Sequence, residues 1–175
     1  MALMAFQLRS VKKWKYDVFL NFLWEDFNGN FVTDLYKRLE DIGIKTFKHD
    51  DRSARGAPIS TEISEAIEES RIAITIFSGN YVLSKRCLKE ITKIMDCVDS
   101  HGQEFFPVFY RTEPLAVSRI FDLDKHRAYL MGSDLGMLLM GSDSEEVQSW
   151  KDALSEAFDI AGLKQDYYSF GRTHW

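Results

Sequence analysis

Short apolar runs recur along the first two thirds of this chain. They are YDVFLNF at residues 16–22, IKTF at 44–47, RIAITIFS at 71–78 and EFFPVFY at 104–110. Runs of this length that are rich in Val, Ile and Phe are typical of strands buried on both faces of a sheet. The four runs therefore predict four strands.

The segments between and after these runs have apolar residues at every third or fourth position, which predicts helices with one buried face. Ser84 can cap the helix that follows the third strand, and Gly43 can end the helix that follows the first. Ser142 and Glu145 have the spacing of a capping box before the last helix. The predicted apolar stripes consist of Phe31, Leu35, Leu39 and Ile42; of Ile63, Ala66 and Ile67; of Leu88, Ile91, Met95 and Val98; and of Val147, Trp150, Leu154 and Phe158.

Strands that alternate with helices predict an α/β fold with an open parallel sheet and helices on both faces. In such sheets, ligands bind beyond the carboxyl ends of the strands. The polar loop at residues 48–60 and the helix that contains Glu90 both begin at that edge. The pattern weakens at residues 111–130, where it predicts one short helix or two, and we interpret residues 131–144 as a Gly/Ser loop.

The composition fits one globular domain. A chain of 175 residues with 45% hydrophobic residues can fill a single core, and a net charge of -5 argues against nucleic acid as the main partner. Cys87 and Cys97 match no metal-binding spacing and are expected to be reduced thiols. The N-terminal segment lacks the order of a signal peptide, and no apolar run approaches the roughly 20 residues of a membrane helix. We therefore expect a soluble, cytoplasmic domain without a membrane partner.

Glu90 raises the main functional question in the sequence. It lies four residues after Arg86 on the predicted helix, so the two can form an ordinary solvated ion pair, worth about 0.3–0.5 kcal/mol. The alternative is that Glu90 is the working carboxylate of a site at the binding edge of the sheet. The spacing alone fits both interpretations.

Several motifs in one register resemble a plant-type TIR (Toll/interleukin-1 receptor homology) domain. They are YDVFLNF at 16–22, GAPISTEISEAIEESRIAITIFSGNY at 56–81, CLKEI at 87–91, PVFY at 107–110 and the last helix, VQSWKDALSEAFDIAG. The resemblance runs from residue 16 to residue 163. It leaves residues 1–15 and 164–175 as N- and C-terminal extensions.

The resemblance implies a flavodoxin-like domain with five parallel strands that self-associates in plant defence signalling. It also implies hydrolysis of the nicotinamide–ribose bond of NAD+ or NADP+, which is the substrate, so that no separate cofactor is expected. The family's catalytic carboxylate falls on Glu90, and its mobile BB loop falls on residues 48–59. The residues expected to line the substrate site are Phe22, Leu23, Trp24, Arg55, Gly56 and Arg86.

A single carboxylate is chemically sufficient for this reaction. Most glycosidases need a second carboxylic acid because a poor leaving group must be protonated. Nicotinamide in NAD+ is already a cationic pyridinium and leaves as a neutral molecule. The remaining task is to hold the ribose hydroxyls and to stabilise the oxocarbenium charge, which one fixed carboxylate can do.

This sequence departs from the family pattern at four places, one of which is the region after the fourth strand, where the family's Gly-containing pattern is missing. The family's Arg and Gly after the first strand are replaced by Leu23 and Trp24, and Leu23 cannot supply the donor fork of an Arg. The family's Trp before CL is replaced by Arg86. The Ser-His pair that helps TIR domains to stack is Thr33-Asp34, and a carboxylate there is expected to weaken that contact by like-charge repulsion.

These departures keep a second function open, namely a catalytically silent TIR module that acts as an adaptor or a decoy for other TIR domains. A free Glu90 in an open groove would favour the hydrolase, whereas an Arg86 side chain against Glu90 would favour the silent module. A phosphoreceiver is a weak third alternative. Its paired acids would be Asp50 and Asp51, which belong to the loop after the second strand.

Overall fold

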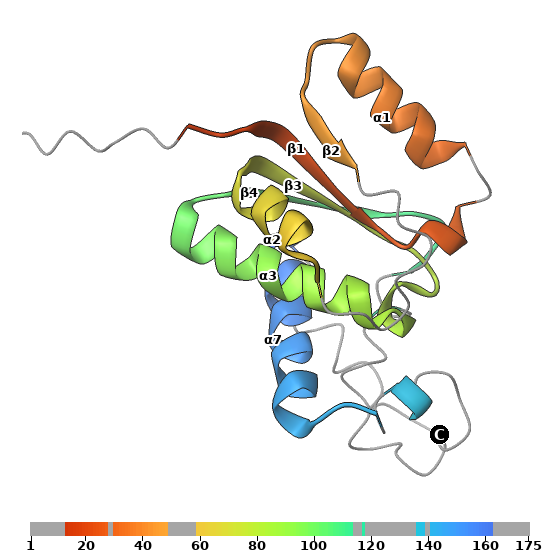
Figure 1. Cartoon of the computed structure of the whole chain (residues 1–175). Helices are drawn as coiled ribbons and strands as arrows, with labels where there is room; N and C mark the ends of the chain where they lie inside the picture. The colour runs from red at the N-terminus through yellow and green to blue at the C-terminus, as the bar shows by residue number, and fades with distance from the viewer. Residues whose placement is uncertain are drawn as a thin grey trace, which may run out of the picture.

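The computed structural model describes residues 13–27, 30–48, 59–113, 117, 136–138 and 141–162. Within them, four parallel strands form one sheet in the order β2-β1-β3-β4 (Figure 1). The strands are β1 (Tyr16–Phe22), β2 (Thr46–Lys48), β3 (Ser70–Phe77) and β4 (Glu104–Phe109). The predicted parallel α/β fold is confirmed, and the fifth strand implied by the resemblance is not among the described residues.

Helices follow the strands as the apolar spacing predicts. They are α1 (Phe31–Asp41), α2 (Thr61–Glu68), α3 (Lys85–His101) and α7 (Ser144–Ile160), with short 3-10 helices η1 (Trp24–Asp26) and η2 (Tyr81–Leu83). Most of residues 111–130, where one or two short helices are predicted, lies outside the described residues, as do most of the BB loop and the C-terminal extension; Val117 is described and helical. Among the described helices, none combines the length and apolar composition needed to cross a membrane.

Local capping explains where the helices begin and end. The Ser84 side chain accepts a hydrogen bond from the amide of Cys87 at 3.3 Å, which confirms the predicted cap of α3. Gly43 adopts a φ of 84° just after α1, a conformation that glycine reaches without strain.

The predicted cap of α7 is wrong by one residue. Asp143, not Ser142, is the N-cap, and its carboxylate accepts from the amide of Glu146 at 2.7 Å. The hydroxyl of Ser142 instead donates to the carbonyl of Leu138 at 3.0 Å. Asp is as good a cap as Ser, and Asp143 is the residue that directly precedes the first helical turn.

The sheet separates two cores, because successive side chains of β1 point to opposite faces. Val18, Leu20 and Phe22 belong to the α1-side core, which also contains Val32 of α1. Phe19 belongs to the larger α3-side core, where α2, α3 and α7 pack (Figure 1). Asn21 points to this second side, where α3 carries Glu90.

Candidate functional site

The candidate site lies where the carboxyl end of β1 meets the first turns of α3. The chain reaches α3 from β3 through η2, so that the start of α3 lies near the edge at which parallel α/β sheets bind ligands. Within the described residues, Glu90 is the only buried carboxylate, with 3% of its surface exposed. A carboxylate in this position is therefore not a solvated surface group.

The two oxygens of Glu90 have different surroundings. Oε2 accepts a hydrogen bond from Nδ2 of Asn21 at 3.1 Å. Oε1 lies 3.7 Å from Nε of Arg86 and has no hydrogen-bond partner in the part of the chain that the structure describes. Burial raises the pKa of Glu90 to about 7, and the positive charge of Arg86 opposes this shift. Near neutral pH, the carboxyl is thus poised between its two protonation states.

Arg86 is directed inward and not toward solvent. Only 8% of its surface is exposed, and Nη2 donates to the carbonyl oxygen of Phe22 at 3.2 Å. Burial acts to lower the pKa of Arg86, but attraction to the carboxylate of Glu90 opposes this, and the pKa is raised. Of the two arrangements considered from the sequence, the observed one has the Arg86 side chain against Glu90.

Asn21 and Tyr81 complete the site, although neither was predicted from the sequence. Both are fully buried. The Tyr81 hydroxyl lies 2.7 Å from Oδ1 of Asn21 and 3.2 Å from the carbonyl oxygen of Cys87, and its single proton is directed to the nearer acceptor, Asn21. The signal for Asn21 in the sequence is a polar amide between the apolar residues Leu20 and Phe22 at the end of β1.

The residues predicted to line the substrate site are divided between the two faces of the sheet. The side chains of Phe22 and Trp24 pack in the α1-side core, on the face opposite Glu90. Leu23 is buried in the α3-side core and offers no polar group there. Lys48 lies over the ring of Trp24, 5.5 Å from its centroid. Arg55 and Gly56 lie outside the described residues.

The two cysteines are reduced, as the sequence predicts. Both are free thiols, and both are buried. Burial raises the pKa of Cys87 to about 12, so its thiol stays protonated and is a poor nucleophile. The described residues contain no group of three or more His, Cys, Asp or Glu side chains that could hold a metal ion.

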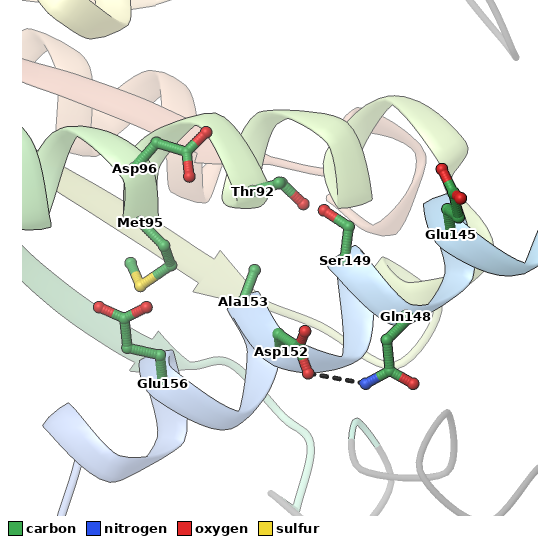
Figure 2. Close-up of a pocket in the computed structure, with 9 residues that line it drawn as sticks. All are labelled: Thr92, Met95, Asp96, Glu145, Gln148, Ser149, Asp152, Ala153 and Glu156. Atoms are coloured by element: carbon green, nitrogen blue, oxygen red, sulfur yellow. Dashed lines mark hydrogen bonds between the residues drawn. The ribbon is translucent and has the colours of Figure 1, made fainter.

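A hollow of about 440 Å³ lies between α3 and α7, apart from Glu90 (Figure 2). Four carboxylates line it, and one of them, on Asp152, accepts a hydrogen bond from Gln148 at 2.7 Å. Burial and the nearby Asp99 raise the pKa of another, that of Glu156. The hollow therefore collects negative charge and shares no residue with the Glu90 site.

The chain matches the TIR domain family over residues 15–169. It is 39% identical over 153 residues to the TMV resistance protein N of Nicotiana glutinosa, covering 87% of this chain and 13% of that protein. It is 38% identical over 158 residues to the disease resistance protein RPV1 of Vitis rotundifolia, covering 87% of this chain and 10% of that protein. The chain thus spans only a small part of these relatives.

Among solved structures, the chain is similar to the TIR domains of the activated Roq1 resistosome, which directly recognises the pathogen effector XopQ. The TM-score is 0.67 at 36% identity, with 83% of this chain and 84% of that chain covered. The parallel α/β sheet, the order of the motifs along the chain and these matches all indicate the same family. The chain belongs to the TIR domain family and is a TIR domain of the kind found in plant disease resistance proteins.

Proposed function

We propose that this chain acts in plant immune signalling in the cytoplasm by associating with other TIR domains. We further propose that Glu90 is the carboxylate of a site that hydrolyses NAD+ or NADP+, and that Arg86 keeps this site closed in the isolated chain. The similarity to resistance proteins and to the TIR domains of a resistosome supports the signalling role. The surroundings of Glu90 support the catalytic role.

The buried Arg86–Glu90 pair is the observation that carries the proposal. Removing a carboxylate and a guanidinium from water costs several kcal/mol for each ion, and this is offset only when their hydrogen bonds are good. Here the two groups are 3.7 Å apart and Oε1 of Glu90 lacks a hydrogen bond. Burial and a charged partner shift the pKa values of acids at functional sites, and a buried polar atom without a hydrogen bond needs an explanation such as a catalytic role.

The chemistry assigned to Glu90 requires only its carboxylate. When Arg86 moves away, Oε1 becomes free to accept hydrogen bonds from the ribose hydroxyls. The negative charge then stabilises the oxocarbenium ion that forms as neutral nicotinamide departs. Water completes hydrolysis to ADP-ribose, and capture by a group of the same nucleotide gives a cyclic product.

Closure by Arg86 is an electrostatic and a steric effect at once. The guanidinium offsets the charge that the reaction needs, and its bond to the carbonyl of Phe22 holds it beside Glu90. Association with a second TIR domain is the event that we propose displaces it. The reaction rate per molecule is therefore expected to rise with protein concentration.

The direct test is nicotinamide release from NAD+ and from NADP+ across a wide range of protein concentration. Release should rise more steeply than in proportion to concentration, and Glu90→Gln should abolish it while the protein stays folded. Equal release by Glu90→Gln would show that the activity comes from elsewhere. If nicotinamide release rises only in proportion to protein concentration, the reaction does not require association between TIR domains.

The silent interaction module is the second candidate, and two observations favour it: the Arg86 side chain lies against Glu90, and Leu23 replaces the family's Arg. Leu23 is buried in the α3-side core, where the family has an Arg able to bind phosphate or ribose groups. A silent module would still bind a catalytically active TIR domain. If the chain changes the activity of such a partner while releasing no nicotinamide itself under any condition, this second function replaces the first.

A further inference from the structure

We infer that Asn21 is a positioning residue for Glu90, and that Tyr81 in turn fixes the orientation of the Asn21 amide. This inference rests on the proposed function of Glu90. It is drawn from three buried side chains on three separate elements: Asn21 on β1, Tyr81 on η2 and Glu90 on α3.

The hydrogen bonds run in one direction through these side chains. The hydroxyl of Tyr81 donates to Oδ1 of Asn21 at 2.7 Å, and Nδ2 of Asn21 donates to Oε2 of Glu90 at 3.1 Å. Because Oδ1 accepts from Tyr81, the amide must turn its N–H group toward the carboxylate. The amide therefore meets Glu90 with a donor, which is the favourable partner for an ionised acid.

This contact gives the two oxygens of Glu90 different roles. Asn21 holds Oε2, so the carboxylate cannot rotate freely. Oε1 is left directed to the side where Arg86 lies, without a hydrogen bond of its own among the described residues. A carboxylate fixed by one oxygen presents the other in a defined place, which is the preorganisation that a catalytic group needs.

Asn21 also favours the charged form of Glu90, since a hydrogen bond donated to a carboxylate stabilises its ionised state. The other titratable groups that face Glu90 in the described structure are Arg86 and Cys87 on the same helix and Tyr81 on η2. Burial raises the pKa of Cys87 to about 12 and that of Tyr81 well above its ordinary range. Both stay neutral near pH 7, so a change in the titration of Glu90 can be read without interference from them.

The test is a carbon-13 NMR titration of the Glu90 carboxyl, with its signal assigned by its loss in Glu90→Gln. Asn21→Leu removes the donor at nearly constant volume and should raise the pKa of Glu90 by roughly one unit. Tyr81→Phe should produce a smaller shift in the same direction. An unchanged pKa of Glu90 in folded Asn21→Leu would overturn the inference. If Asn21→Leu does not fold, an unchanged pKa of Glu90 in Tyr81→Phe would overturn it instead.

Thr75→Val is the matched control. Thr75 is fully buried on β3 in register with Asn21, and its hydroxyl has no hydrogen-bond partner in the described residues. This variant removes a buried polar group beside Asn21 without removing a hydrogen bond to Glu90. A shift as large as that of Asn21→Leu would mean that the effect is general to the core.

A kinetic measurement separates this inference from the proposed function. In an Arg86→Trp background, Asn21→Leu should lower kcat more than it changes KM, and the acid limb of the pH profile should move to higher pH. Loss of activity with an unmoved pH limb would indicate a structural role only. If Arg86→Trp releases no nicotinamide, the proposed function fails, while the NMR titration still decides whether Asn21 positions Glu90.

Discussion

Two opposing influences act on the carboxyl group of Glu90. Burial favours its neutral form, and Arg86 favours its charged form, with burial the larger of the two. The balance brings the pKa to about 7, whereas an unfolded Glu titrates near 4.5. The folded chain therefore holds a proton on this residue over a pH range where the unfolded chain has lost it. Folding and the ionisation of the candidate site are linked as a result.

The linkage predicts how stability responds to pH. Between about pH 4.5 and pH 7 the native state binds more protons at Glu90, so its contribution to stability falls as pH rises. Glu90→Gln mimics the neutral form and should match the wild type near pH 4.5. At pH 8 it should be more stable by about 3 kcal/mol. Urea unfolding of both proteins between pH 4.5 and pH 8 measures the difference, and a constant difference would contradict the raised pKa.

At the scale of elements, α3 connects the site to the rest of the fold. Its apolar stripe fills the α3-side core, while Arg86 and Glu90 on its first two turns face β1. The helix α7 packs along α3, and Glu146 of α7 forms ion pairs with Lys85 at 2.8 Å and with Lys89 at 3.3 Å. The position of Glu90 therefore depends on contacts between helices that are far apart in the sequence.

Apolar packing, more than these ion pairs, should hold α7 in place. Trp150 and Leu154 are almost completely buried, and replacing either with Ala should cost about 3 kcal/mol or more in the free energy of unfolding. Gln148→Ala, at an exposed position of the same helix, should change it by only about 0.5 kcal/mol. Urea unfolding distinguishes the core variants from the surface variant. Equal losses of unfolding free energy in both would show that α7 is not held by its apolar face.

The start of α7 makes a separate prediction. Asp143→Ala removes the cap of the Glu146 amide and should cost about 1 kcal/mol, whereas Asp143→Asn keeps a capping oxygen and should cost little. Both variants remove the same charge near the helix N-terminus, so their difference isolates the hydrogen bond. Equal losses measured by thermal unfolding would assign the effect to charge alone.

The strands and helices could be predicted because each depends on a local pattern. The run at 16–22 forms β1 with the same bounds, and Ser84 caps α3 as expected. The role of Asn21 could not be predicted, because it depends on side chains 60 and 69 residues away. The direction of Arg86 was also undetermined, since i,i+4 spacing allows a solvated pair and a buried one equally.

At the scale of the whole molecule, the question is how one TIR domain meets another. Asp34 is exposed on the first turn of α1, at the position where the resemblance to TIR domains implies a His that helps one domain to stack on another. If two copies meet through this face, the carboxylates of the two Asp34 side chains repel each other. The chain is therefore expected to associate weakly by itself.

Asp34→His should strengthen self-association. We expect sedimentation velocity to show a larger dimer fraction at the same concentration, with Asp34→Asn intermediate because it only removes the charge. The acidic residue also favours the helix N-terminus, so the His variant should lose a few tenths of a kcal/mol in stability. Unchanged association in both variants would place the contact on another face.

Nicotinamide release by Arg86→Trp tests the central claim most directly. Losing the guanidinium also raises the pKa of Glu90, so the comparison belongs on the alkaline side of the pH profile, where the carboxyl is ionised. There Arg86→Trp should free Glu90 and raise release from NAD+ by on the order of tenfold over the wild type, whereas Arg86→Lys, which keeps the charge, should raise it less. The gain should vanish in the double variant with Glu90→Gln. If folded Arg86→Trp releases no more nicotinamide than the wild type at any concentration, Arg86 does not close a catalytic site in this chain.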